Sequence, residues 1–172
     1  MDSKQFNNQV VALSDKCFRL AKSILRDADV AQDAVQDLIL KLWEKRHSLG
    51  DVENIQAFTM RSMRNLCLDI IRQKHEETEL PAETEYSELN PHQQTEQKDM
   101  VLRIKRMIDN LPELQRTIIR MRDVEGMELK EIAYITDLTE NAVTVNLSRA
   151  RQKIRERIMN ENKRTEATIW KA

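Results

Sequence analysis

The stretch "LTENAVTVNLSRARQKIRERI", from Leu138 to Ile158, decides how this sequence folds. Its apolar residues recur at steps of four, three, four and four, which is the spacing of one face of an α-helix. Beside this face, most of the charged residues after Glu140 are basic, whereas an ordinary surface helix mixes both signs. The apolar residues are Val143, Leu147, Ala150, Ile154 and Ile158, and the basic residues are Arg149, Arg151, Lys153, Arg155 and Arg157.

A second, shorter helical pattern precedes this stretch. Apolar residues at helical spacing run through "MELKEIAYITD", and a turn is expected at Asp137–Leu138. Thr139 is a good N-cap for the second helix, and Glu140 lies in its first turn, where the helix dipole favours an anion. Leu138 is apolar inside the turn, as a helix–turn–helix requires to fix the angle between its helices.

Two interpretations fit this pair of helices. A helix held in this way can enter the major groove of DNA and present its first turns to base edges. Its basic C-terminal half would then lie against phosphates. The alternative is a helical hairpin in a protein-interaction domain. The cap, the turn, the apolar positions and the basic half together favour DNA binding.

The composition of the whole chain favours long helices. Its 172 residues include only two glycines and three prolines, too few for many tight turns, and 33% of the residues are charged. The formal net charge is −1, so the chain has no overall positive field that would attract nucleic acid. Any such role must therefore depend on local basic patches.

The chain divides into two helical blocks. The helical pattern of the first block ends near His75, and that of the second begins near Asp99. The segment between them holds two prolines and seven glutamates but few apolar residues, which is typical of a flexible linker. We therefore expect an all-α protein, with two small helical bundles joined by a flexible acidic linker, the C-terminal one a helix–turn–helix domain. The expected ranges are 1–75, 76–98 for the linker, and 99–165.

Patterns for catalysis or metal binding are weak. Glu44 and His47 form a Glu-x-x-His pattern, as in di-iron bundles, but such a site needs a second pair and two further glutamates. The other histidines, His75 and His92, have no glutamate three residues before them. The sequence has no CxxC motif, no glycine-rich phosphate loop and no nucleophile motif. We therefore expect no enzyme activity, no metal and no cofactor.

The cysteines and the hydropathy pattern indicate the compartment. Cys17 and Cys67 lie far apart, each among apolar helical residues, so we expect both to be reduced core residues. The sequence shows no signal peptide and no apolar run long enough to cross a bilayer. A soluble, cytoplasmic protein with no direct membrane insertion is expected.

The C-terminal block is similar to the C-terminal domain of the extracytoplasmic-function (ECF) sigma factors of bacterial RNA polymerase, which belong to the sigma-70 family. The family pattern has a Leu-Pro start, an "EG" pair before "EIA", a turn, and then a helix with "V…RAR". The matching residues are Leu111-Pro112, Glu125-Gly126, Glu131-Ile132-Ala133, Val143 and Arg149-Ala150-Arg151.

The N-terminal block resembles the same family in two further motifs. "DAVQDLILKLWEKR" resembles the family's polymerase-binding helix, and "AFTMRSMRNLCLDIIRQK" resembles the promoter helix that follows it. The resemblance covers nearly the whole chain and implies a sigma factor that binds core RNA polymerase and directs promoter recognition and transcription initiation. The alternative is a helix–turn–helix regulator that acts without being a polymerase subunit. Its N-terminal block should then be a receiver or ligand domain, and no strand pattern supports a receiver.

The resemblance implies three sets of contact residues, and it is also the only indication of a further partner, an anti-sigma factor. The set for core RNA polymerase is Asp33, Gln36, Asp37, Leu40 and Trp43. The set for the promoter DNA of the −10 element is Asn54, Phe58, Arg61, Arg64, Asn65 and Arg72. The set for the −35 element is Thr144, Val145, Ser148, Arg149, Arg151 and Lys153.

Three residues depart from the family pattern within the second helix of the pair. Asn141 stands where the family often has glycine, but asparagine tolerates unusual backbone angles. Val145 stands where a small polar residue is common, and Asn146 where an arginine is common. Because these changes affect base preference, the resemblance does not predict the promoter sequence.

Overall fold

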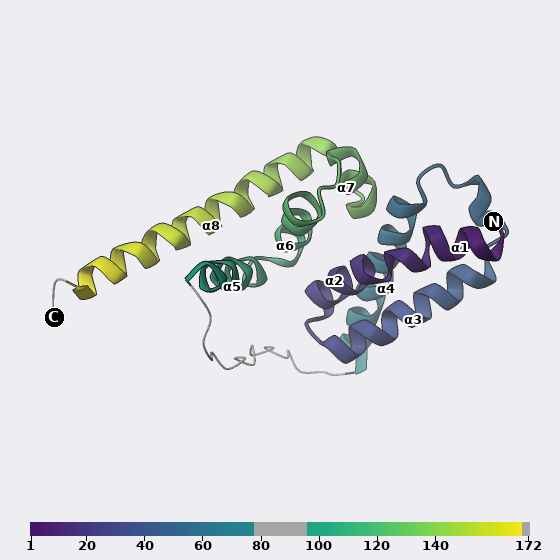
Figure 1. Cartoon of the computed structure of the whole chain (residues 1–172), viewed down its shortest axis with the longest axis horizontal. Coiled ribbons are helices and arrows are strands. Elements are labelled where there is room, and N and C mark those ends of the chain that lie inside the picture. The colour runs from purple at the N-terminus through teal and green to yellow at the C-terminus, as the bar shows by residue number, and fades with distance from the viewer. Residues whose placement is uncertain (78–95, 170–172) are drawn as a thin grey trace.

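The computed structural model describes residues 1–77 and 96–169, with side chains described for residues 1–74 and 100–161. Every regular element within these ranges is a helix, which confirms the predicted all-α fold (Figure 1). Most of the acidic linker predicted at 76–98 lies outside the described residues.

Four α-helices build the N-terminal block. They are α1 (Ser3–Gln9), α2 (Ser14–Leu25), α3 (Ala28–Glu44) and α4 (Ile55–Glu77), with 3₁₀ helices at Val11–Leu13 and Ser48–Asp51. Arg26 ends α2 in a left-handed conformation, with φ at 61°. Asp27 then caps α3 by accepting hydrogen bonds from the backbone N–H groups of Asp29 and Val30. Arg26 and Asp27 therefore make a sharp turn between α2 and α3.

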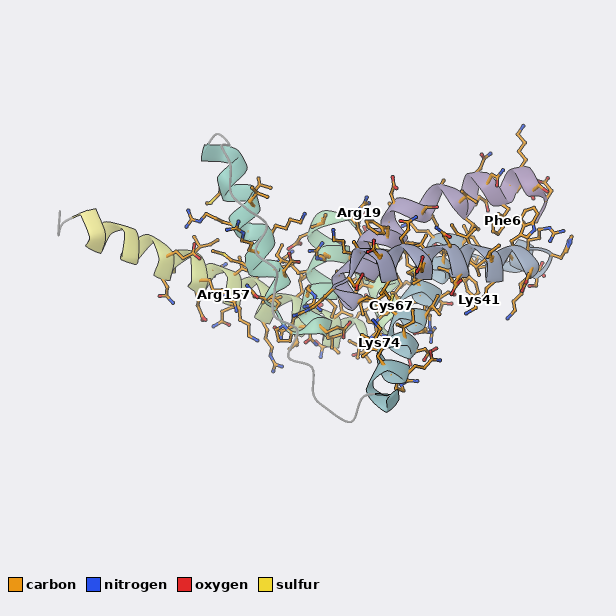
Figure 2. All side chains as sticks on the ribbon, turned by 90° about the horizontal axis from the view of Figure 1, so that it is seen from below. Phe6, Arg19, Lys41, Cys67, Lys74 and Arg157 are labelled. Atoms are coloured by element: carbon orange, nitrogen blue, oxygen red, sulfur yellow. The ribbon has the colours of Figure 1, made fainter. Side chains whose placement is uncertain are left out.

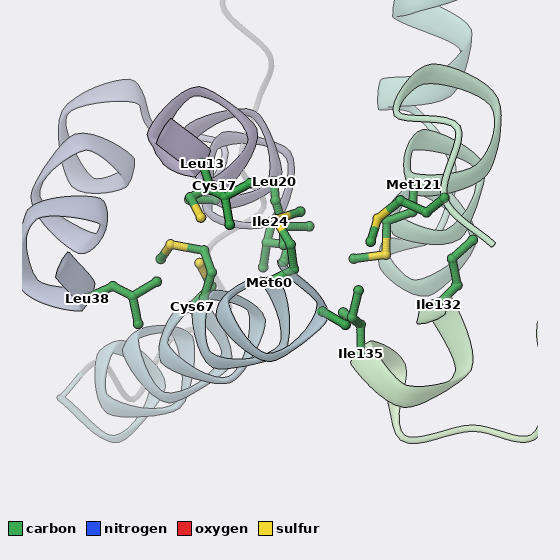
Figure 3. Close-up of a cluster of buried hydrophobic side chains, with 14 of the residues drawn as sticks. Leu13, Cys17, Leu20, Ile24, Leu38, Met60, Cys67, Met121, Ile132 and Ile135 are labelled. Atoms are coloured by element: carbon green, nitrogen blue, oxygen red, sulfur yellow. The ribbon is translucent and has the colours of Figure 1, made fainter. Parts of the chain in front are cut away.

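Helices α2, α3 and α4 pack on one another through their apolar stripes. Cys17 of α2 and Cys67 of α4 are both buried in this core, and both are free thiols, as expected (Figure 3). Burial disfavours the charged thiolate and raises the pKa of each thiol to about 12. At one end of the core, the rings of Phe6 and Trp43 meet edge to face, with centroids 5.1 Å apart.

The C-terminal block consists of α5 (Glu96–Asp109), α6 (Glu113–Ile119), a π-helical turn (Arg120–Val124), α7 (Leu129–Thr136) and α8 (Glu140–Ile169). Gly126, with φ at 69°, turns the chain between the π-helical turn and α7. Helix α8 is the longest element of the described chain and extends away from the rest of the molecule (Figure 1).

A buried arginine joins α5 to α6. Arg116 is only 2% exposed, and one of its nitrogens, Nη1, donates to the carbonyls of Asp109 and Leu111 at 3.1 and 3.2 Å. These carbonyls lie at the end of α5 and just beyond it, where a helix leaves carbonyl groups to be bonded from outside. Arg120 also pairs with the Asp109 carboxylate. The guanidinium groups therefore fix the sharp bend between the two helices.

The two blocks contact each other directly, which the sequence did not predict. Helix α4 packs on α7, and α2 packs on α6. Figure 3 shows Ile135 of α7 between Met60 of α4 and Met121 of the C-terminal block. All three side chains are at most 1% exposed, so the hydrophobic core continues from one block into the other.

Candidate nucleic-acid interface

The turn between α7 and α8 has the geometry of a helix–turn–helix. Asp137 ends α7 in the left-handed conformation, with φ at 60°, and the N–H of Leu138 donates to the Ala133 carbonyl at 3.0 Å. Thr139 caps α8, because its Oγ1 accepts from the N–H of Ala142 at 3.2 Å. The turn and the cap predicted from the sequence are both confirmed.

Helix α8 separates a buried face from an exposed one. Val143, Leu147 and Ala150 are at most 5% exposed and hold the helix against the rest of the block. The first four residues of the predicted −35 set lie on the opposite side and reach the surface. They are Thr144, Val145, Ser148 and Arg149, and Lys153 is exposed one turn further along.

Arg151 differs from the other members of the predicted −35 set. Its Nε and Nη2 donate to the two carboxylate oxygens of Asp123 at 3.1 and 2.5 Å. The hydrogen bond to Asp123 raises the pKa of Arg151, which favours the charged guanidinium. The pair ties α8 to the turn after α6, and it neutralises a charge that the resemblance assigns to DNA.

The predicted −10 residues follow one side of α4. Phe58, Arg61, Asn65 and Arg72 are spaced by three, four and seven residues, which places them on a common face. Phe58, Arg61 and Arg64 are half-buried, whereas Asn65 and Arg72 are exposed. Arg72 forms an ion pair with Asp69 at 3.0 Å.

Two members of this set are already engaged by the C-terminal block. The Nδ2 of Asn54 donates to the Oε1 of Glu131 at 2.8 Å, while its Oδ1 caps α4 by accepting from the N–H of Ala57. Arg61 pairs with Asp137 at 3.2 Å. Its guanidinium also lies 4.6 Å from the centre of the Tyr134 ring, a cation–π contact. The partners Glu131, Tyr134 and Asp137 all come from α7 or its end.

A separate surface lies on α3. Asp33, Gln36 and Asp37 are exposed on the side of the helix that faces away from the core. Leu40 continues this side and is 61% exposed, which is high for a leucine. Trp43 is half-buried, with Phe6 on one side and the guanidinium of Arg46 4.3 Å from its ring centre. The first four members of the predicted polymerase set therefore lie on one exposed face of α3.

Sequence reasoning missed several residues that the fold brings together. Arg19 and Glu125 form a two-bond ion pair between the blocks, with N–O distances of 2.7 and 2.9 Å. Tyr134 and Asp123 were also missed. The sequence carries no signal for such contacts, because the partners are far apart in the chain and each resembles an ordinary surface residue.

The geometry defines a class of protein: a two-part helical DNA-binding factor, with a C-terminal helix–turn–helix and an N-terminal bundle that presents a separate acidic and apolar face. The family model "Sigma-70 region 2" matches residues 10–77, and the model "Sigma-70, region 4" matches residues 102–154. The chain belongs to the sigma-70 family of RNA polymerase sigma factors, within its ECF group. It is an alternative sigma factor, a protein that directs promoter recognition together with RNA polymerase.

Individual relatives agree with this assignment. RNA polymerase sigma factor SigV of Bacillus subtilis is 29% identical over 145 residues, which are 84% of this chain and 86% of that protein. ECF RNA polymerase sigma factor SigW of the same organism is 24% identical over 169 residues, with 91% and 90% covered. ECF RNA polymerase sigma factor SigM of Mycobacterium tuberculosis is 26% identical over 136 residues, with 79% and 68% covered.

Solved structures share the fold. The sigma factor RpoE of Bartonella quintana, in complex with the anti-sigma factor NepR, superposes with a TM-score of 0.72 at 22% identity, covering 89% of this chain and 96% of that one. CnrH, in complex with the cytosolic domain of CnrY, superposes with a TM-score of 0.64 at 20% identity, covering 92% and 90%.

Among the described residues, no group of three or more His, Cys, Asp or Glu side chains could hold a metal ion. In the same part of the chain, no helix combines the length and the apolar character needed to cross a membrane.

Proposed function

We propose that the two blocks of this sigma factor divide the work of promoter recognition. The N-terminal block docks on core RNA polymerase through α3 and contacts the −10 element through α4. The C-terminal block reads the −35 element with α8. The observation that carries this proposal is the separation of faces: on α3 and on α8, most of the predicted contact residues are exposed on the side opposite the buried stripe.

The face of α3 suits a basic protein surface with an apolar hollow. Leu40 supplies exposed apolar area that would leave water on docking. Asp37 and Asp33 lie about one and two helical turns before Leu40 and supply negative charge at the rim. Charges at a rim set the rate and specificity of association more than its free energy. The proposed role of this face is therefore to select the polymerase and to orient α3 on it.

The exposed face of α8 suits the major groove. Arg149 can donate two hydrogen bonds to a guanine, and Thr144 and Ser148 can bond to several base edges. Val145 offers methyl groups that can contact thymine. Lys153 lies one turn beyond Arg149, where a phosphate contact adds affinity without sequence preference.

Helix α4 is proposed to hold one strand of opened promoter DNA. Arg61, Arg64 and Arg72 would contact phosphates, and Asn65 would contact bases. Stacking of a base on an aromatic side chain contributes roughly 1–3 kcal/mol. Phe58 is half-buried in the core, so we expect it to offer only one edge or part of one face.

An anti-sigma factor is the further partner that we propose. The RpoE structure contains such a protein, and its sigma factor shares this fold over most of both chains. In this proposal, the chain acts in the cytoplasm and performs no chemistry itself, because it directs the polymerase that does.

Copurification with core RNA polymerase tests this function. We expect the purified full chain to form a stoichiometric complex with core polymerase and to start transcription from promoters that the core enzyme alone ignores. A chain that fails to bind core polymerase, yet binds duplex operator DNA by itself, would instead be a regulator that acts without being a polymerase subunit.

A further inference from the structure

Val145 makes one point on the exposed face of α8 apolar. Its side chain is 39% exposed, and it stands where the family pattern commonly has a small polar residue. We call Thr144, Val145, Ser148 and Arg149, which are all exposed, the reading face. A valine side chain has no group that donates or accepts a hydrogen bond. Any base that Val145 distinguishes must therefore offer an apolar group.

The polar residues on either side of Val145 are turned back onto the helix. The Thr144 hydroxyl donates to the Glu140 carbonyl at 2.9 Å, which uses its only proton. This hydroxyl can therefore accept a hydrogen bond from a base but cannot donate one. Asn146 is half-buried, and its Nδ2 donates to the Ala142 carbonyl at 2.9 Å. The side-chain amide of Asn146 is thus held to α8 rather than presented to DNA.

Arg149 supplies the guanidinium of the reading face. Two later arginines of α8 are engaged within their own block: Arg151 pairs with Asp123, and Arg157, labelled in Figure 2, donates to the Met107 carbonyl at 3.2 Å. Arg149 follows Val145 by four residues, which is roughly 6 Å along the helix axis. Because base pairs are stacked roughly 3.4 Å apart, these two side chains reach pairs one or two steps apart.

We infer that Val145 determines the specificity of the reading face by contacting the 5-methyl group of one thymine in the −35 element. The guanine that Arg149 contacts lies one or two base pairs from this thymine. The inference rests on the proposed function, in which α8 lies in the major groove. It adds the base that the chain prefers at this position, where its residue departs from the family pattern.

The chemistry of an A·T pair fits both neighbours on α8. Thymine is the only one of the four bases with an apolar group, its methyl group, on the major-groove edge. The adenine opposite it offers the N6 amino group, a donor that the accept-only hydroxyl of Thr144 can bond. Contact with Val145 removes the thymine methyl group from water, and loss of one buried methyl group weakens binding about fourfold.

Replacement of thymine by deoxyuridine tests this contact, because it removes the methyl group and keeps every hydrogen-bonding group of the base pair. The probes are duplexes that the full chain, in complex with core polymerase, recovers from a random-sequence library. Each thymine of a recovered duplex is replaced in turn, and the affinity of the complex is measured. We expect one replacement in the upstream element to weaken binding about fourfold. Unchanged affinity for every replacement there would overturn the inference.

The variant Val145→Ala assigns the methyl contact to this residue. It should bind the thymine and deoxyuridine forms of that duplex equally, because the alanine side chain is too short to reach the methyl group. Its thermal unfolding should not change, since Val145 is exposed. Val124→Ala, at a valine that is 58% exposed outside α8, is the matched control and should keep the fourfold difference. If Val145→Ala also keeps that difference, another residue reads the methyl group and the inference is wrong.

The guanine contact separates this inference from the proposed function. Replacement of the nearby guanine by 7-deazaguanine removes the N7 acceptor and should weaken binding about fivefold in the original chain, but not in Arg149→Ala. A complex that recovers no preferred upstream sequence would contradict the proposed function, and the inference with it. A complex that shows the guanine effect without any thymine methyl effect would contradict the role of Val145 alone.

Discussion

Arg151 on α8 and Asp123 in the turn after α6 form a two-point ion pair, with N–O distances of 3.1 and 2.5 Å. The resemblance places Arg151 among the DNA contacts, yet the structure gives it a partner within its own block. Because Asp123 accepts from Nε and Nη2, only the remaining N–H groups of this guanidinium are available to a phosphate. The pair therefore sets how much of the basic charge of α8 is available to DNA.

Asp123→Asn is expected to release Arg151 for phosphate. Because the side chains are 51% and 35% exposed, the pair stabilises the fold by only about 0.5 kcal/mol, and thermal unfolding should change little. Affinity for random duplex DNA should rise about two- to threefold, and the slope of log affinity against log salt should steepen by up to about one. Arg151→Ala is the matched control and should show no such gain. Equal affinities for Asp123→Asn and the original chain would leave Arg151 a structural residue only.

The double variant Asp33→Lys/Asp37→Lys is expected to lose association with core polymerase. Both carboxylates are exposed on α3 and lie off its buried stripe, so helicity and thermal unfolding should stay nearly unchanged. Pull-down with core polymerase measures the effect. Glu53→Lys/Glu156→Lys makes the same change in net charge at exposed positions outside the proposed face and should bind normally. Normal binding by the Asp33/Asp37 variant would remove α3 from the docking surface.

The helices and the helix–turn–helix could be predicted because their signals are local. Thr139 caps α8 by accepting from the backbone N–H three residues ahead, and the apolar stripe of α8 repeats every three or four residues. The break between α1 and α2 could not be predicted from the sequence. Spacings of three and four from Val10 onward fit a continuous helix as well as the 3₁₀ helix at Val11–Leu13 that the structure contains.

The arrangement of the two blocks could not be predicted in the same way. Arg19 and Glu125 are separated by 106 residues, and nothing near either residue indicates the other. Arg61 has the same sequence environment whether it faces water, DNA or Asp137. Exposure of the α3 and α8 faces followed from periodicity, whereas the partial covering of the −10 surface by α7 is visible only in three dimensions.

Arg149→Ala and Lys153→Ala are expected to weaken DNA binding in different ways. Arg149 lies on the exposed face of α8, and loss of a two-point base contact should cost roughly 1–3 kcal/mol for promoter duplex only. Lys153→Ala should weaken promoter and random duplexes alike and reduce the salt slope by about one. Fluorescence anisotropy on both duplexes across a salt series measures this. If Arg149→Ala weakens both duplexes equally, Arg149 is a phosphate contact rather than a base reader.

The two buried thiols are expected to make the fold less stable at alkaline pH. Burial raises the pKa of Cys17 and of Cys67 to about 12, whereas an unfolded cysteine has a pKa of about 8.5. A raised pKa in the folded state means that the stabilisation is fully present below pH 8.5 and declines as the pH rises toward 12, because the unfolded chain releases these protons first. Between pH 8 and pH 10, the two groups together should lower the free energy of unfolding by up to about 4 kcal/mol.

Urea unfolding at pH 8 and pH 10 measures this loss, and Cys17→Ala/Cys67→Ala is the control. The control chain should be less stable at pH 8, because two buried side chains become smaller, but it should lose less stability between the two pH values. Iodoacetamide should react with both thiols only after unfolding, since the thiolate is the reactive form and the folded chain keeps it protonated. An equal loss of stability in both chains would mean that lysine or tyrosine groups, and not these thiols, control the alkaline limit of the fold.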